Sequence, residues 1–516
     1  MPIMLDQNKK ISLLVSIACA LVVTFWSFVV PMFEFPDEQA HFSTVEFLAK
    51  NDRIPVGLES DMTEELKETE VLLGVFRNAS GQNKFTYHAE YRATYLPGTI
   101  GLYEPQIISF NSPDFKDSYV ATEAARYPRA YYDYSGFLNK LVNSQDIIMR
   151  LFVTRLGSFV LSFVTAYFIF QAGLLLFKKY QYAATLTIMV MLQPMFSFVS
   201  AGINSDNLHN LLFTIGIYLS LLIIEKGFSL GTLILLAATL ALDVYSKPQG
   251  VILLLLVGLS IFIRAIVSKN IRLLVALIVF AILGALLTKT ALSPYLGFLK
   301  VANIHGSSFK EFLNFSINKS IAQNAVWYWG VFKWLGVVLP PMYWRVANRL
   351  VLLGALGILI YLYKYFKKKK SLIPMPSMIF LVLSFTIYTF SIFWFDWQHN
   401  KLNGYSLGIQ ARYFYPTILA QMSLLMTGIL SFSWNKTSKI WLRRILLLLF
   451  IWLQLGGIFT LLNSYYNILP VSDLISQLSQ YKPFFAKGNI WYLWTTIYLS
   501  SISMLIYLSL KSKSEK

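Results

Sequence analysis

Residues 11–30 read ISLLVSIACALVVTFWSFVV, and residues 31–42 that follow read PMFEFPDEQAHF. The first stretch is uniformly apolar and is long enough to cross the roughly 30 Å hydrocarbon core of a bilayer as a helix. Similar apolar runs recur along the whole chain of 516 residues, of which 56% are hydrophobic and only 14% are charged. The sequence therefore predicts an all-α protein that crosses a membrane many times.

We expect about twelve spans. The first is too long for a signal peptide and no small-residue cleavage site follows it, so it should remain as a span. The predicted spans cover residues 11–31, 148–177, 182–200, 206–225, 228–245, 249–267, 271–292, 347–365, 373–395, 412–431, 440–464 and 490–510.

The net charge of +18 is unevenly distributed along the chain. Residues 32–147 hold 18 of the 26 acidic residues but only 10 of the 44 basic ones, a net charge of −8, so the rest of the chain carries +26. Those bases lie mostly in short loops between apolar runs, which is the positive-inside pattern of a membrane protein rather than a nucleic-acid surface. The pattern places both termini and KYFKKKK (364–370) in the cytoplasm, and the loop 32–147 outside.

One apolar segment does not fit the count of spans. Residues 327–341, WYWGVFKWLGVVLPP, would move KYFKKKK to the outer side if they crossed the membrane. We expect an interfacial or re-entrant segment instead, because Trp and Tyr favour the headgroup zone. The only cysteine, Cys19, lies inside the first span, so neither an intrachain disulfide nor a cysteine metal cluster can form.

Acidic residues follow directly on the first span. A helix start after Pro36 would explain Asp37 and Glu38, because acids in a first turn complement the helix dipole. Placing charged side chains where the chain leaves the membrane costs free energy, however, so we favour a catalytic role for these acids. Asp37 and His41 share a helix face and, together with Glu38, could bind a divalent cation such as Mg²⁺ or Mn²⁺.

Two more polar stretches are predicted at the outer ends of spans. Asp206, in INSDNLHN, is either the cap of a polar turn or a second carboxylate facing the same cavity as Asp37. Lys247, in LDVYSKPQG, either snorkels from the end of a span or binds a phosphate at headgroup level.

Several arginines beside aromatic residues are further candidates. Arg412 precedes Tyr413 where the tenth span enters the membrane, and an arginine there can bind a phosphate through two parallel hydrogen bonds. Arg129 and Arg345 lie in similar surroundings. An aromatic belt with anchoring arginines would explain all of them equally well.

Three classes of function stay open at this point. The sequence has no phosphate-binding loop, dinucleotide fingerprint, HExxH or GxSxG motif. The candidate groups gather outside, where nucleotide-activated substrates are absent, so a lipid-activated substrate fits better. The protein would be a glycosyltransferase with a lipid-phosphate donor, a polysaccharide polymerase or ligase with a lipid-diphosphate donor, or a non-enzymatic lipid-glycan transporter.

Five motifs in order carry a more specific resemblance: PDEQAHF, PMFSFVSAGINSDNL, SKPQG, WYWGVFKWLG and GIQARYFYP. Together they resemble the GT-C superfamily of polyprenyl-phosphate-sugar-dependent glycosyltransferases. More narrowly, they resemble a family of large bacterial membrane proteins long known only as a domain of unknown function. The resemblance covers about residues 11–430, and the usual Gly-Arg-Tyr of the family appears here as Ala411-Arg412-Tyr413.

The resemblance implies a helical bundle with juxtamembrane helices in its large outer loop. A catalytic transmembrane module would cover residues 1–430, and C-terminal transmembrane helices would cover residues 431–516. The implied reaction is an inverting transfer of a sugar from a lipid phosphate. We expect the lipid to be undecaprenyl phosphate and the acceptor to be a cell-surface glycan, such as a wall polysaccharide or teichoic acid. The transfer would take place on the outer side of a bacterial plasma membrane.

The resemblance also implies roles for residues. The catalytic carboxylate would be Asp37, with Glu38 beside it. For such a glycosyltransferase we expect, from the residues themselves, that Lys247 and Arg412 hold the leaving lipid phosphate. We expect further contacts to the substrate from Tyr413, Asp206, Arg129 and Arg345.

Overall fold

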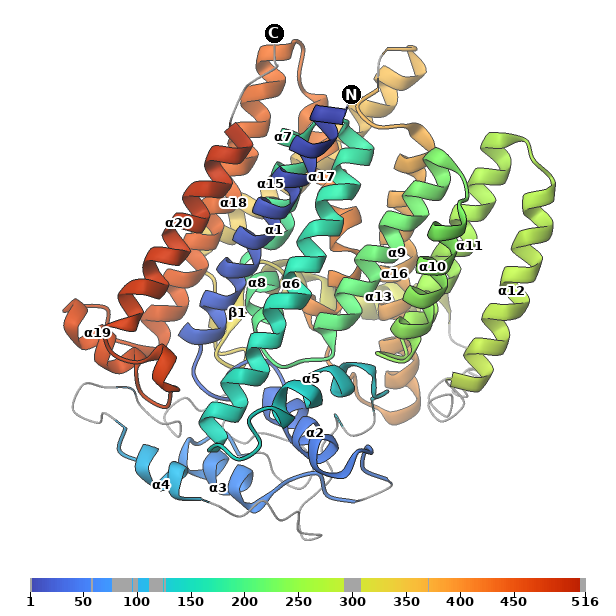
Figure 1. The fold of residues 1–516 in the computed structure, drawn as a ribbon. Helices are drawn as coiled ribbons and strands as arrows, with labels where there is room; N and C mark the ends of the chain where they lie inside the picture. Colours follow the sequence, from blue (N-terminus) through green and yellow to red (C-terminus); the bar gives the residue numbers. More distant parts are fainter. Residues whose placement is uncertain are drawn as a thin grey trace.

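The computed structural model describes residues 2–56, 59–76, 95, 101–110, 124, 127–291, 308–369 and 371–510. Long helices stand side by side in a bundle, with both chain termini at one end and the loop after the first helix at the other (Figure 1). Nine helical segments in the described ranges are long and apolar enough to span a bilayer. They are α1 (Pro2–Val29), α6 (Ile147–Phe177), α9 (Asp206–Lys226), α11 (Gly250–Ser268), α15 (Pro341–Phe366), α16 (Met375–Asn403), the 3₁₀ helix η6 (Ala411–Thr417) with α17 (Ile418–Ser431), α18 (Lys436–Tyr465) and α20 (Ile490–Leu510).

Three further apolar elements lie where the other predicted spans were expected. Helices α7 (Tyr180–Met191) and α8 (Pro194–Ala201) are bent by 68° at their junction, as in a broken span or a re-entrant loop, because Pro194 cannot continue the hydrogen-bond ladder of α7. The other two are α10 (Leu230–Val244) and α12 (Arg272–Ala291). The prediction of an all-α bundle with about twelve membrane-spanning elements is confirmed.

Short helices cover the end of the bundle opposite the termini (Figure 1). They are α2 (Glu38–Asn51), α3 (Glu64–Leu72), α4 (Glu104–Ser109) and α5 (Ala130–Lys140). Arg150 in the first turn of α6 ties two of them to the bundle, with 2.7 Å to Glu46 of α2 and 2.6 Å to Glu65 of α3. All three side chains are nearly buried, so the first loop is anchored to the spans by charge as well as by packing.

The segment 327–341 does not cross the membrane as a helix. It forms a small antiparallel hairpin of β1 (Val331–Phe332) and β2 (Val337–Val338). Phe332 of this hairpin packs against Trp26 of α1 and Phe198 of α8. The preference for a non-spanning segment is therefore correct. The remaining short elements are α13 (Phe309–Ser316), the π-helix η5 (Ile317–Ile321), α14 (Ala322–Trp327), α19 (Val471–Leu478) and the 3₁₀ helix η7 (Phe484–Ala486).

Helices α15 and α17 pack directly backbone to backbone. A Cβ atom added at Gly357 of α15 would overlap the carbonyl group of Gly428 on α17, and one added at Gly428 would overlap the carbonyl group of Gly354. Small residues allow this close approach, which is a common basis of helix association in membranes.

We predict that Gly428→Ala destabilises the bundle by about 1–3 kcal/mol or more, because the added methyl group has no space between the two backbones. The thermal unfolding midpoint of the purified protein in detergent would measure this. Gly231→Ala in α10 is the matched control, since its Cβ would meet no atom within 4 Å. Equal midpoints for the two variants would contradict the close packing.

Candidate functional site

The exit of α1 is fixed by a buried arginine from α6. Arg155 donates to both carboxylate oxygens of Glu38, at 2.8 and 2.5 Å. It also donates to the carbonyl groups of Ser27, Val30 and Pro31 at 2.7–2.9 Å, where α1 ends. Both charged side chains are fully buried, so Glu38 is committed to this contact.

Asp37 points a different way from its neighbour. It lies in the left-handed region with φ 58° and ψ 18°, a conformation that Asp tolerates better than most residues. Its side chain does not cap α2, although Asp37 is the residue that precedes this helix. It forms an ion pair with Arg412 of η6 instead. The helix-cap interpretation of Asp37 therefore does not describe the contact that its side chain makes.

A second ion pair lies beside the first. Asp206, the first residue of α9, pairs with Lys247 in the turn after α10, and both side chains are more than nine-tenths buried. Arg412 Nη1 lies 4.0 Å from the other carboxylate oxygen of Asp206, so the two pairs join into one cluster of alternating charge. Segments that are far apart in the sequence thus meet at one point.

Arg412 keeps unused hydrogen-bonding capacity. Its side chain is only 3% exposed, yet its Nε and Nη1 atoms have no hydrogen-bond partner among the described residues. Its guanidinium carbon lies 5.3 Å from the ring centre of Tyr413. A buried guanidinium with two spare N–H groups is suited to bind an anion with two oxygens.

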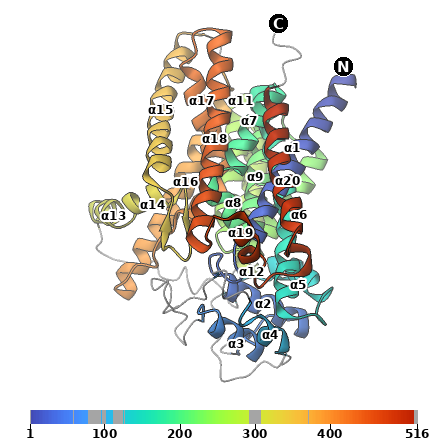
Figure 2. The ribbon, with the colours of Figure 1, turned by 90° about the vertical axis from the view of Figure 1, so that its left-hand side faces the viewer.

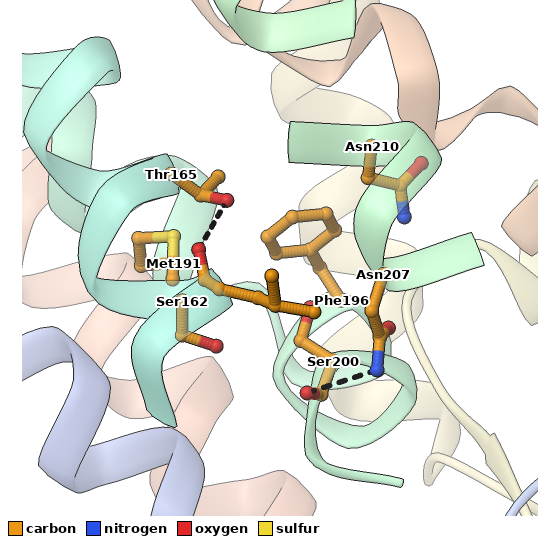
Figure 3. A pocket seen from close by; sticks show the side chains of 8 residues that line it. Ser162, Thr165, Met191, Phe196, Ser200, Asn207 and Asn210 are labelled. Carbon is orange, nitrogen blue, oxygen red and sulfur yellow. Dashed lines mark hydrogen bonds between the residues drawn. The ribbon is translucent and has the colours of Figure 1, made fainter. Parts of the chain in front are cut away.

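Asparagine side chains hold the turn that carries Asp206. Asn204 donates to the carbonyl group of Pro36 at 3.1 Å and accepts from the backbone N–H of Asp206 at 2.8 Å. Asn207 reaches back to the carbonyl groups of Ser200 and Gly202, beside a small polar cavity of about 10 Å³ between α6 and α9 (Figure 3). The turn before α9 is thereby tied to the turn before α2.

A histidine network lies next to the second ion pair. His209 Nδ1 lies 2.6 Å from Asp243 of α10, and its Nε2 lies 3.4 Å from the hydroxyl group of Tyr388 on α16. The carbonyl group of Asp243 accepts the backbone N–H of Lys247 at 2.9 Å. This network therefore fixes the backbone from which Lys247 projects.

His41 is a buried neutral group at the edge of the cluster. Its Nδ1 lies 2.8 Å from the hydroxyl group of Tyr132 on α5. Burial lowers the pKa of His41 to about 3, and the nearby carboxylate of Asp37 offsets this shift only in part. His41 is therefore uncharged at physiological pH.

The structure does not bring the three predicted metal ligands together. Glu38 is occupied by Arg155, and Asp37 faces Arg412. In the part of the chain that the structure describes, no group of three His, Cys, Asp or Glu side chains is arranged to hold a metal ion. The described residues therefore do not fit the suggested divalent cation. Cation dependence stays a prediction that titration with a chelator tests.

Two other predicted arginines lie outside the cluster. Arg129 forms a surface pair with Asp133 one turn later, at 2.7 Å. Arg345 is exposed on α15 beside the ring of Trp344. The sequence reasoning also missed one residue, Arg155. A charged residue in the middle of an apolar run was the signal that could have identified it.

An apolar groove has part of its wall in η6, the 3₁₀ helix that also carries Arg412. It has a volume of about 550 Å³ and is lined by α14, α15, α16, Phe414 of η6 and α17. Phe414 lies two residues after Arg412. Val351, Val382 and Phe385 line the groove and are partly exposed on the outside of the bundle, so the groove opens toward the lipid.

We predict that Glu38→Gln lowers the thermal unfolding midpoint strongly, because it leaves the buried charge of Arg155 without its counter-ion. Breaking a buried ion pair typically costs about 3–5 kcal/mol. Glu59→Gln, which breaks an exposed pair with Arg53, is the matched control and should change the midpoint little. Similar midpoints in both variants would contradict a structural role for the Glu38–Arg155 pair.

Solved structures similar to this chain include ArnT from Cupriavidus metallidurans. In the apo state ArnT shows 14% identity over 96% of this chain and 76% of its own length, with a TM-score of 0.41. Bound to undecaprenyl phosphate it shows 14% identity, 96% and 77% coverage, and a TM-score of 0.39. The archaeal oligosaccharyltransferase AglB from Archaeoglobus fulgidus, in complex with an inhibitory peptide and a dolichol-phosphate, shows 11% identity over 88% of this chain and 55% of its own length, with a TM-score of 0.41.

No curated protein is significantly similar to this chain in sequence. Residues 20–420 match the family described as "Predicted membrane protein (DUF2142)", which is most of the chain. The protein therefore belongs to this family of multi-pass membrane proteins.

Proposed function

We propose that this protein is an inverting glycosyltransferase that moves a sugar from a polyprenyl phosphate, such as undecaprenyl phosphate, to a cell-surface glycan. The observation that carries the proposal is the buried guanidinium of Arg412, with two N–H groups unused among the described residues and Lys247 in the same cluster. Two buried cations at the ends of transmembrane segments favour an anion held at the membrane surface.

The position of the cluster suits a lipid-linked phosphate. Asp37 and Asp206 both stand at the turn between a span and the loop end of the bundle, so the cluster lies near headgroup level. The groove lined by Phe414 would accept the isoprenoid chain, because its lining is mostly apolar and it is open toward the lipid. A lipid phosphate bound in this way would present its sugar to the side covered by α2 and α5.

The reaction follows from the charges that change. Asp37 accepts the proton of an acceptor hydroxyl group, and that oxygen forms a bond to the anomeric carbon of the sugar. The bond between the anomeric carbon and the phosphate oxygen breaks, and its electron pair stays on the phosphate. The donor phosphodiester has one negative charge and the departing monoester has up to two. Arg412 and Lys247 would stabilise the additional charge.

Donor binding would also activate the base. In the free protein the carboxylate of Asp37 is paired with Arg412, and that of Asp206 with Lys247. A cation paired with a carboxylate makes it a weaker base. A phosphate that takes over Arg412 would release Asp37 to accept a proton, so the base becomes effective only when the donor is present.

The proposed setting is the outer side of a bacterial plasma membrane. The positive-inside pattern supports this orientation, since the loop with α2–α5 lies opposite the ends of the chain (Figure 1). A wall polysaccharide or teichoic acid is the proposed acceptor. The polymerase alternative is less well supported, because both lysines of the late loop are engaged: Lys482 with the carbonyl group of Val30, and Lys487 with Glu104.

We predict that Asp37→Asn transfers sugar at least about 100-fold more slowly, the low end for loss of a general base. Asparagine keeps the size of the side chain and tolerates the left-handed backbone, so the variant should still fold. The measurement is glycoside formation by purified protein with a synthetic polyprenyl-phosphate sugar. Asp133→Asn, which disrupts only the surface pair with Arg129, should retain full activity.

Two results would contradict this proposal. Unimpaired transfer by Asp37→Asn would remove the carboxylate from the chemistry. Movement of the lipid-linked sugar across vesicle membranes without any new glycosidic bond, in the wild-type protein, would support the transporter alternative instead.

A further inference from the structure

A second pocket lies at the opposite end of the bundle from the ion-pair cluster. It has a volume of about 230 Å³ and lies where α15 ends and α18 begins. Its walls come from the end of α15, the turn before α16, the end of α17 and the first turn of α18. These helix ends lie on the same side as the chain termini (Figure 2).

The pocket is strongly basic. Lys364, Lys436 and Lys439 line it. The segments that form it, residues 341–381 and 424–451, contain no aspartate or glutamate. Lys436 is exposed and forms no ion pair with any residue in the described ranges. The lining residues therefore bring positive charge and no carboxylate to the pocket.

Two further features make the electrostatic potential in the pocket more positive. Lys364 donates to the carbonyl groups of Ser431 and Ser433, at 2.7 and 2.9 Å, and an ammonium group has a third N–H donor left. The 30-residue helix α18 begins at the pocket with Asn435 as its cap, so its positive dipole end lies there too.

The surroundings are those of a membrane surface. Trp434 lines the pocket and is 84% exposed, and Trp441 on the next turns of α18 is 58% exposed. Exposed tryptophans are typical of the headgroup zone. Leu359 on α15 and Ile445 on α18 are also exposed, and both lie between the pocket and the middle of their helices. A ligand with an anionic head and apolar chains would match both parts.

We propose that this pocket binds the phosphodiester headgroup of an anionic phospholipid, separately from the donor lipid of the proposed reaction. Basic pockets between transmembrane helices are suited to such headgroups. The phosphate would contact Lys436 and Lys439 and the start of α18, while the acyl chains would lie along the exposed apolar side chains of α15 and α18. Bound lipid would add a second contact between these two helices, at the opposite end from the packing of Tyr343 against Trp452.

The test is lipid binding by the detergent-purified protein, measured by native mass spectrometry with phosphatidylglycerol and phosphatidylcholine. Phosphatidylglycerol should bind preferentially. Each basic residue near an anionic headgroup corresponds to roughly a fivefold change in binding, so Lys436→Gln with Lys439→Gln should weaken it about 25-fold. Both residues lie at the surface, and an unchanged thermal midpoint without lipid would verify folding.

The matched control is Lys367→Gln with Lys368→Gln, which removes the same charge from the same end of the bundle outside the pocket. It should leave binding unchanged. Equal weakening in the two double variants would show a general attraction to anionic lipid and overturn the site. Competition by inorganic phosphate as effective as competition by the lipid would also overturn it, because the acyl chains would then contribute nothing.

Discussion

The rest of the site depends on the buried ion pair between Glu38 and Arg155. Arg155 satisfies three carbonyl groups at the end of α1 and both oxygens of Glu38 at the start of α2. The charge of an arginine buried inside a membrane bundle must be compensated, so breaking this contact would strongly lower the free energy of unfolding. The turn between α1 and α2 is therefore rigid, and Asp37 is held at a fixed position within it.

Adjacent carboxylates consequently have different roles. Glu38 is fully buried and supports the backbone, whereas Asp37 is 24% exposed and faces Arg412. In the proposed reaction, the ion pairs of Asp37 and Asp206 are a resting arrangement in which opposite charges neutralise each other. A donor phosphate would exchange places with a carboxylate at Arg412, which couples donor binding to the basicity of Asp37.

Much of the fold could be predicted from the sequence, because a membrane span is a local property of about 20 apolar residues. Asp37, Asp206, Lys247 and Arg412 could also be selected, since each is a charge at the end of a span. The sequence does not show which of the two neighbouring acids, Asp37 or Glu38, faces the cluster. That choice depends on the left-handed backbone of Asp37 and on Arg155, which is distant in the sequence. Arg129 and Arg345 resembled Arg412 in sequence, but only contacts between distant segments separate a surface arginine from a buried one.

A structure with undecaprenyl phosphate bound would show whether the phosphate replaces Asp37 at Arg412. We expect the phosphate within hydrogen-bonding distance of both Arg412 and Lys247, with the carboxylate of Asp37 released from Arg412 and the isoprenoid chain in the groove beside Phe414. A lipid phosphate bound elsewhere, with the Asp37–Arg412 and Asp206–Lys247 pairs intact, would contradict this exchange.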